Sequence, residues 1–492
     1  MGKVNEYIDK IINIVKSKTI SKDKPWLQYY NDMPEKIDYY SGSMYDFIKK
    51  TSGIFPNNIA YEYFGQKTTY KNFIKKIDKV ADSLKAFNVV ENECITICLP
   101  NTPEAVILVY ACNKVGAIAN IVHPLSSVLD IEKALKETNS SILFCSDVSM
   151  KIAREIKVDK FIFVPVSNEF SKILKGIYNI KNKLNFILED NMISWEKFIE
   201  KESNKKEGSV KRTGDDPAAI IYSGGTTGKS KGIIISNKNF NAMAQQTAWA
   251  CKEVIPGYSI LSALPIFHVF GLAVCIHVPL CAGMKCIIVP KLNIKAFNKT
   301  IKKSKPNVLP VVPSLLKIMI NDKDPGKNAF KCIKAVPCGG DFLSDEAKNE
   351  ANQYLKNHGS KATIKVGYGL SEATGFCLST YDNYNVSKGV GIPNPDTIVK
   401  IFEPKSDVEL PFGEVGEICI NGPTIMMGYI NEDKENNDTL KIHCDNKIWL
   451  HTGDLGKMEK DGMFYYVSRL KRMIITNGYN IYPIEIEQII NK

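Results

Sequence analysis

Arginine is scarce in this 492-residue chain: it occurs only at positions 154, 212, 469 and 472, although Lys and Arg together number 64 and the formal net charge is +11. The lysines are spread along the chain, with many Ile and Asn residues among them. We interpret this pattern as a compositional bias toward lysine rather than a nucleic-acid-binding patch, so no nucleic-acid partner is predicted. A diffuse positive field would still attract small polyanions.

Closely spaced cysteine pairs are also missing, and no signal peptide is expected from the first residues. The thirteen cysteines form no C-x-x-C pair and mostly sit among apolar residues, as in "CITICLP", which favours reduced, buried thiols over disulfides or zinc. The start "MGKVNEYIDK" lacks the apolar core of a signal peptide. These observations predict a cytoplasmic protein.

The longest uncharged run, residues 254–284, contains no Asp, Glu, Lys or Arg. Its length would allow it to cross a bilayer, but the prolines at 256, 265 and 279 would break a membrane-spanning helix. We expect buried strand, loop and helix around a pocket instead.

Helical periodicity alternates with short β-branched runs before residue 150. The stretch "TTYKNFIKKIDKVADSLKAFNV" predicts an amphipathic helix whose apolar stripe is Phe73, Ile77, Val80, Leu84 and Phe87. "CITICLP" and "SILFCSD" are typical of buried strands, and "TPEAVILVYACNKVGAIA" of a helix between them. This alternation predicts a parallel, helix-covered sheet. It resumes over residues 215–395, and Gly-rich turns after about 400 predict an antiparallel β unit.

Residues 168–214 are polar and rich in Asn and Lys, and they predict a connector or surface excursion. Within them, "FSKILKGIYNIKNKL" predicts a basic amphipathic helix with one apolar face, formed by Phe170, Ile173, Leu174, Ile177 and Ile180. Such a face can pack on the protein's own core, which we expect here, or lie on an anionic membrane surface.

The stretch "SGGTTGKSKG", residues 223–232, has the composition of a phosphate-binding loop. It is not a P-loop, because G-x-x-x-x-G-K-[ST] would require glycine at position 223, which is Ser223. Glycines let backbone amides converge on an anion, Thr hydroxyls add donors, and Lys229 and Lys231 supply charge. A flexible Gly-Thr turn is the alternative.

This loop resembles the signature loop of the AMP-forming adenylating enzymes, which include acyl-CoA synthetases, peptide-synthetase adenylation domains and luciferases. Their approximate pattern is [YT]-[ST]-S-G-T-T-G-x-P-K-G. The matching residues are Tyr222, Gly225, Thr226, Thr227, Gly228, Lys231 and Gly232, whereas Gly224 and Ser230 depart from it. The resemblance implies that residues 223–229 bind ATP phosphates and that Thr226 and Lys231 take part in catalysis.

Three further motifs follow in the family's order. "VGYGLSEAT" resembles its Y-G-x-T-E motif, which implies that Tyr368 stacks on adenine beside Gly369, that Ser371 bonds phosphate, and that Glu372 holds Mg²⁺. "WLHTGDLG" resembles its T-G-D motif, which implies that Asp454 binds the ribose hydroxyls. The alternatives without a ligand are that Glu372 is a carboxylate on a helix surface and that Asp454 is an aspartate in a turn.

"SRLKRMIITNGYNIYPIEIE" resembles the family's interdomain segment. The resemblance implies that Arg469 contacts ribose, that Lys471 is the hinge, and that Gly478 lies beside the pantetheine arm of CoA. "AVPCGGDFL" is similar to the segment that approaches adenine, which adds Gly339, Gly340 and Asp341 to the nucleotide site.

The resemblance implies an α/β fold: a large domain of two helix-covered sheets with a small β-barrel-like subdomain, followed by the start of a small α+β domain. The expected divisions are residues 1–467 for the large domain, containing 215–395 as a second α/β subdomain and 400–467 as the β subdomain, and 468–492 for the hinge and the start of the small domain. Relatives continue beyond the point that matches Lys492 and carry a later lysine that contacts the substrate carboxylate, so slow adenylate formation is expected.

"LPIFHVFGLAVC" distinguishes branches of the family. Amino-acid-activating members carry Phe-Asp where this chain has Phe267 and His268, a pair that resembles acyl- and aryl-CoA ligases. We expect an apolar acyl pocket of His268, Phe270, Leu272, Val274 and Cys275. The predicted function is acyl-CoA synthesis from a fatty or aryl acid, with ATP, Mg²⁺ and CoA. The alternatives are adenylation of an amino acid or other carboxylate without CoA transfer, or an inactive nucleotide-binding fragment. Weak peripheral membrane contact is also considered, and no oligomeric state is predicted.

Overall fold

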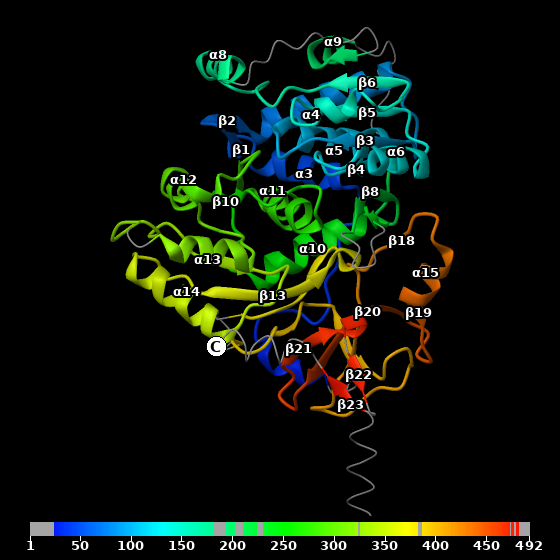
Figure 1. The fold of residues 1–492 in the computed structure, drawn as a ribbon, viewed down its shortest axis with the longest axis vertical. Coiled ribbons are helices and arrows are strands. Elements are labelled where there is room, and N and C mark those ends of the chain that lie inside the picture. Colours follow the sequence, from blue (N-terminus) through cyan, green and yellow to red (C-terminus); the bar gives the residue numbers. More distant parts are fainter. Residues whose placement is uncertain are drawn as a thin grey trace, which may run out of the picture.

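The computed structural model of the chain describes residues 24–181, 192–201, 210–223, 230–322, 325–381, 386–472, 474–476 and 479–481. Of the predicted site residues, Gly224, Gly225, Thr226, Thr227, Gly228, Lys229 and Gly478 lie outside these ranges. The described part is a mixed α/β fold with several sheets, as expected (Figure 1).

An eight-stranded sheet forms the upper part of the molecule in Figure 1, with strand order β18-β9-β8-β4-β3-β5-β6-β7. The six strands from β3 to β8 run parallel, and β9 and β18 are antiparallel additions at one edge. The strands are β3 (Cys94–Cys98), β4 (Ile118–Ile121), β5 (Ile142–Cys145), β6 (Lys160–Phe163), β7 (Met192–Ser194), β8 (Pro217–Tyr222), β9 (Gly232–Ser236) and β18 (Gly428–Tyr429).

The helices of this part are α3 (Met44–Ile54), α4 (Tyr70–Ala86), α5 (Pro103–Val115), α6 (Val128–Glu137), α7 (Met150–Ala153), α9 (Trp195–Glu200) and α10 (Asn237–Ala250). The amphipathic stripe predicted for α4 is confirmed, since its five apolar residues are buried. The helix expected over "TPEAVILVYACNKVGAIA" is shorter than predicted. Gly116 adopts a left-handed conformation (φ +83°) that ends α5, and the chain then enters β4.

Two smaller sheets lie beside each other below it. One has the order β10-β11-β1-β2 and the other β12-β13-β14-β15. Single parallel bridges from Ile260 to Val308 and from Val308 to Ala335 connect them. Their strands are β1 (Ile59–Tyr63), β2 (Gln66–Thr69), β10 (Ser259–Ser262), β11 (Lys285–Ile288), β12 (Val336–Cys338), β13 (Ile364–Leu370), β14 (Gly375–Ser379) and β15 (Ile392–Pro393). Strands β1 and β2 therefore join elements that follow them by about 200 residues, and β8 and β9 join the first sheet.

The remaining helices of the middle region are α11 (Val278–Cys281), α12 (Phe297–Ser304), α13 (Pro313–Asn321) and α14 (Asp345–Asn357). Short 3₁₀ turns occupy Pro25–Tyr29, Ile294–Ala296, Ser371–Ala373 and Leu470–Arg472.

The antiparallel β unit expected after residue 400 is confirmed. Five strands form this sheet. The order is β16-β17-β20-β19, and β21 pairs with residues 454–458 of β20, on the same edge that β19 occupies at residues 448–450. The elements are β16 (Ile398–Phe402), β17 (Gly416–Asn421), α15 (Asp433–Thr439), β19 (Leu440–Ile442), β20 (Ile448–Met458) and β21 (Phe464–Arg469), followed by a hairpin of β22 (Ile474–Thr476) and β23 (Tyr479–Ile481). Figure 1 places β20 to β23 at the lower end.

The uncharged run at residues 254–284 folds as predicted into strand β10, a loop, a π-helix (Phe270–His277) and α11. Its prolines and π-type hydrogen bonding keep any single helix short. Among the described residues, no helix combines the length and apolar character needed to cross a membrane.

Residues 168–214 are more than the predicted connector, because β7 pairs in parallel with β6 and so completes the large sheet. Helix α8 (Lys172–Lys181) precedes it. The expectation that its whole apolar face packs on the core is wrong: Ile173, Ile177 and Ile180 are 79%, 56% and 81% exposed. Instead, Phe170, just before the helix, packs on Phe64, and Tyr178 on the helix donates to Asp147.

Candidate functional site

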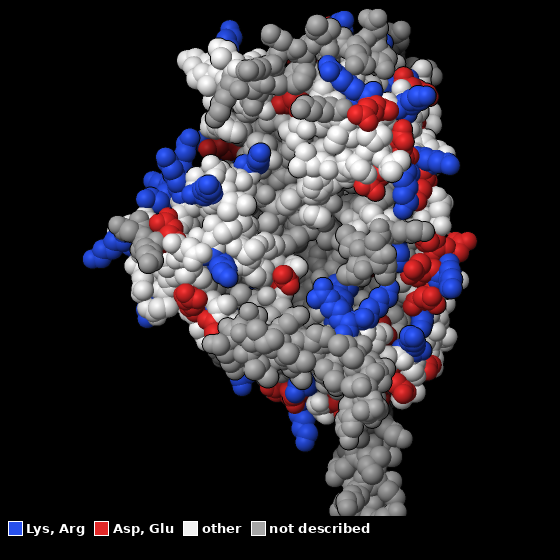
Figure 2. Space-filling model, in the orientation of Figure 1, with Lys and Arg blue, Asp and Glu red and all other residues white. Residues whose placement is uncertain are grey.

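A cavity of about 690 Å³ opens between the middle sheets, the edge of the large sheet and the antiparallel β unit. Figure 2 shows this face hollowed near its centre, with Lys and Arg side chains grouped beside the hollow. The volume suits a substrate of cofactor size. Of the predicted site residues, those that line it are Ser223, Lys231, His268, Phe270, Val274, Gly339, Gly340, Gly369, Ser371, Glu372, Arg469 and Lys471.

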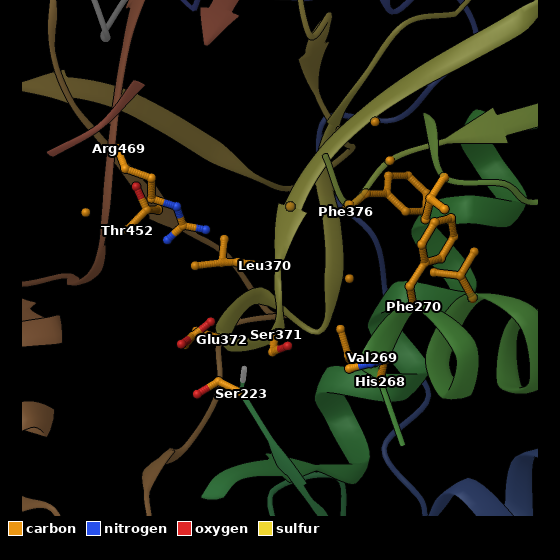
Figure 3. A pocket seen from close by; sticks show the side chains of 18 of the residues that line it. Ser223, His268, Val269, Phe270, Leu370, Ser371, Glu372, Phe376, Thr452 and Arg469 are labelled. Atoms are coloured by element: carbon orange, nitrogen blue, oxygen red, sulfur yellow. The ribbon is translucent and has the colours of Figure 1, made fainter. Parts of the chain in front are cut away.

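The hairpin of β13 and β14 carries the "YGLSEAT" residues to the cavity. Glycine is required at position 369, because a Cβ there would lie 1.8 Å from the carbonyl oxygen of Gly375. The turn continues through Thr374, whose backbone is left-handed (φ +56°). This tight geometry places Ser371 and Glu372 at the cavity wall near Ser223, where the phosphate-loop segment begins (Figure 3).

Charged side chains form a connected row on this wall. Glu372 Oε1 accepts a hydrogen bond of 2.7 Å from the hydroxyl of Tyr429. Lys231 Nζ lies 5.1 Å from the centre of the Tyr429 ring and 2.9 Å from Glu435 Oε2. Lys231 is thus held at the cavity by partners that a phosphate could replace. The Glu372 carboxylate is an oxygen ligand of the kind Mg²⁺ prefers, and Mg²⁺ commonly binds one or two carboxylates plus substrate phosphates, so this wall fits a magnesium–nucleotide complex.

Tyr368 and Asp454 lie behind the lining. The Tyr368 hydroxyl donates to Asp454 Oδ2 at 2.8 Å, and Arg469 Nε lies 2.8 Å from Oδ1 as an ion pair. Oδ1 has no hydrogen bond of good geometry within the described residues. Burial raises the pKa of Asp454 to about 6, although Arg469 and Tyr368 oppose the rise. A buried carboxylate with an unused acceptor is suited to a hydroxyl pair.

The opposite side of the cavity is apolar. It is formed by His268, Val269, Phe270, Val274 and Phe376, and Figure 3 shows Phe270 and Phe376 on the side away from Glu372 and Arg469. Burial, with the neighbouring His123, lowers the pKa of His268. His268 is therefore a neutral ring at pH 7.

Two residues predicted for this acyl pocket are not among those that line it. Leu272 and Cys275 are fully buried in the hydrophobic cores on the far side of the π-helix. The prediction treated the whole apolar stretch as one surface, whereas a helix turns successive side chains to different sides. Asp341 is also outside the lining; it is exposed and accepts a bond from the amide of Phe342.

Several residues that line the cavity were not predicted from the sequence. Tyr429, Glu435, Glu417 and His451 bring polar groups to it from β18, α15, β17 and β20. Tyr429 ends the weakly matching "GPTIMMGY", and His451 directly precedes the T-G-D motif, so both had a positional signal. Glu417 and His451 meet only because β17 and β20 pair, which no local pattern reveals.

The chain matches known proteins over most of its length. The family model described as "AMP-binding enzyme" matches residues 48–430. The chain is 28% identical over 485 residues to a long-chain-fatty-acid–CoA ligase of Bacillus subtilis, covering 95% of this chain and 84% of that one. It is 28% identical to a probable CoA ligase of Humulus lupulus, covering 87% of this chain and 74% of that one.

A solved structure of ATP-bound MatB from Rhodopseudomonas palustris superposes with a TM-score of 0.77 at 22% identity, covering 91% of this chain and 83% of that one. This likeness supports the fold. Since the family model spans most of the sequence, the resemblance found in the motifs is confirmed: this chain belongs to the AMP-binding enzyme family.

Proposed function

We propose that this chain is an AMP-forming acid–CoA ligase that activates a fatty or aryl acid with ATP and passes the acyl group to CoA. The observation that carries the proposal is the division of one cavity into a charged wall with Lys231 and Glu372 and an apolar side with His268 and Phe376. Family membership supports adenylation, and the relatives named above as CoA ligases support transfer to CoA.

In the first step, a carboxylate oxygen of the acid attacks the α-phosphorus of ATP, an O–P bond forms, and pyrophosphate leaves. Lys231 and the 223–229 segment, with Thr226, neutralise charge that develops on the phosphates. Mg²⁺ bound through Glu372 would supply further charge neutralisation. Asp454 and Arg469 hold the ribose, and Tyr368, Gly339 and Gly340 border the adenine. The neutral ring of His268 lies beside the substrate carboxylate and forms no ion pair with it.

In the second step, the CoA thiol attacks the acyl carbonyl, the thioester forms, and AMP leaves with the electrons of the broken C–O bond. We propose Lys471 as the hinge between the large domain, residues 1–467, and the segment 468–492, which begins the small domain. Gly478 would then border the pantetheine arm.

ATP–pyrophosphate exchange across acids from acetate to palmitate, aryl acids and amino acids tests the proposal. We expect exchange with one class of fatty or aryl acid and thioester formation when CoA is added. Glu372→Gln should lose exchange while Glu409→Gln, outside the cavity, should retain it. Exchange with amino acids alone would indicate that the chain activates amino acids and that the apolar side of the cavity does not bind the substrate. ATP binding without any exchange would favour an inactive nucleotide-binding protein.

A second proposal is peripheral membrane contact through α8. Its isoleucines at positions 173, 177 and 180 are exposed, and Lys172 and Lys175 lie on the same short helix. An anionic membrane surface could therefore bind the lysines by charge and the isoleucines by apolar contact. Flotation with vesicles of phosphatidylserine and phosphatidylcholine should recover the chain, and a Lys172/Lys175→Glu variant should float less. Equal flotation of the two proteins would remove this role.

A further inference from the structure

The antiparallel β unit contains a buried polar cluster that the proposed chemistry does not use. Glu417 on β17 and His451 on β20 are 4% and 7% exposed, and His443, just before β20, is 7% exposed. The Nδ1 atom of His451 lies 2.9 Å from Glu417 Oε2, and its Nε2 atom lies 2.9 Å from Nε2 of His443. The other oxygen, Glu417 Oε1, accepts a 2.9 Å hydrogen bond from the amide of Gly453.

The backbone that Glu417 holds is irregular. In the pairing of β17 with β20, Cys419 lies opposite His451 and Glu417 lies opposite Leu455, so residues 452–454 face a single residue of β17. This bulge contains Gly453 in a left-handed conformation (φ +67°) and ends at Asp454. Bulges next to active sites re-aim side chains, and this one turns the Asp454 carboxylate toward Tyr368 and Arg469.

The direction of each proton in the cluster follows from Glu417. Burial alone would raise the pKa of this carboxyl, but the hydrogen bonds from His451 and the Gly453 amide oppose it, and the pKa lies below its ordinary value. An ionised carboxylate only accepts hydrogen bonds. His451 therefore carries a proton on Nδ1. One further proton lies in the 2.9 Å contact between the two Nε2 atoms, and in the neutral arrangement of both rings His443 donates it.

We propose that Glu417 and His451 are positioning residues for nucleotide binding, joined with His443 in a hydrogen-bonded chain that fixes the 452–454 bulge so that Asp454 meets the ribose. The inference rests on the proposed use of ATP. Burial strengthens such a chain because a missing partner leaves a polar group without water.

The same side chains have a competing use. Glu417, Cys419 and His451 bring possible ligand atoms within 4.8 Å of one another, and Cys419 Sγ lies 3.4 Å from His451 Nδ1. A bound ion would need Nδ1 without a proton, whereas the chain requires the proton there. The presence or absence of a proton on His451 Nδ1 therefore distinguishes the hydrogen-bonded chain from a metal site.

The test combines ¹⁵N spectra of the histidine rings with kinetics. In the wild type we expect His451 protonated at Nδ1 and His443 at Nε2. In Glu417→Gln, the amide oxygen can still accept from the Gly453 amide only if the NH₂ group faces His451 Nδ1. The NH₂ group then donates to Nδ1, so the proton of His451 should move to Nε2. The KM for ATP should rise about tenfold, which corresponds to about 1.4 kcal/mol, while the KM for the acid changes less than twofold.

Glu409→Gln is the matched control, because Glu409 lies in the same β unit, 3.0 Å from Lys400, and does not line the cavity. It should leave both KM values and the histidine spectra unchanged. Equal KM values for ATP in wild type and Glu417→Gln would overturn the inference. So would an unprotonated Nδ1 in wild-type His451, or zinc retained by the purified protein. Failure of the wild type to bind ATP at all would instead refute the proposed function. The two failures can be told apart because the wild-type histidine spectra are recorded without ATP.

Discussion

Replacing Asp454 by asparagine should stabilise the ligand-free protein above pH 6 while weakening ATP binding. Asp454 is 2% exposed, and burial raises its pKa from 3.8 to about 6. Between these pH values the folded state holds a proton that the unfolded state releases, so the free energy of unfolding falls as pH rises. Each pKa unit is worth about 1.4 kcal/mol, so ionised Asp454 costs about 3 kcal/mol above pH 6 and nothing below about pH 4.

Asparagine removes this cost and can still accept from the Tyr368 hydroxyl. The loss of the ion pair with Arg469 is already contained in this figure, because Arg469 opposes the rise of the pKa. We expect a net gain of about 3 kcal/mol at pH 8 that disappears by pH 4. Urea unfolding of both proteins at half-unit pH steps measures it.

Asp445→Asn provides a control of opposite sign. The hydrogen bonds from Trp449 and Lys447 outweigh the effect of burial and hold the pKa of Asp445 below its ordinary value. This substitution should lower stability at pH 8 and have less effect in acid. A pH-independent difference between wild type and Asp454→Asn would refute the reasoning. In the wild type, ATP affinity should rise with pH through about 6, since only the ionised carboxylate accepts from both ribose hydroxyls.

Other changes test the remaining walls of the cavity. Glu435→Gln frees Lys231 from its ion pair, so the KM for ATP should fall about twofold to threefold in exchange assays; a rise would contradict competition between Glu435 and phosphate. His268→Ala should raise the KM of the acid and leave that of ATP unchanged, and equal changes in both would argue against a carboxylate wall. Gly369→Ala should abolish ATP binding in calorimetry because of its 1.8 Å clash, whereas Gly176→Ala, with open space around its Cβ, should bind normally.

Much of the local structure was predictable because its causes are local. The apolar stripe of α4 repeats at the helical period, and its five residues are buried as predicted. The clash that requires Gly369 lies within one hairpin, so "VGYGLSEAT" marks its own turn. The missed end of α5 at Gly116 shows the limit, since apolar residues continue unchanged from that helix into β4.

The pairing of distant segments could not be predicted in the same way. Ile173 and Phe170 both belong to a plausible apolar face, yet only contact with Phe64 decides which of them turns inward. Leu272 and Cys275 are as apolar as Val274, and the orientation of the π-helix alone separates core from cavity wall.

The sequence by itself determined the family, the identity of the motif residues and the separation of an α/β part from an antiparallel β part. The family and the motif residues come from the resemblance of local motifs to those of known enzymes, and the separation of the two parts comes from hydrophobic period and turn residues along one chain. Only the tertiary structure decided that Lys231 meets Glu435 and that Glu417 holds Gly453. Those contacts depend on strand register and on packing between elements far apart in sequence, because a hydrogen bond or ion pair requires atoms a few ångströms apart whatever their separation along the chain.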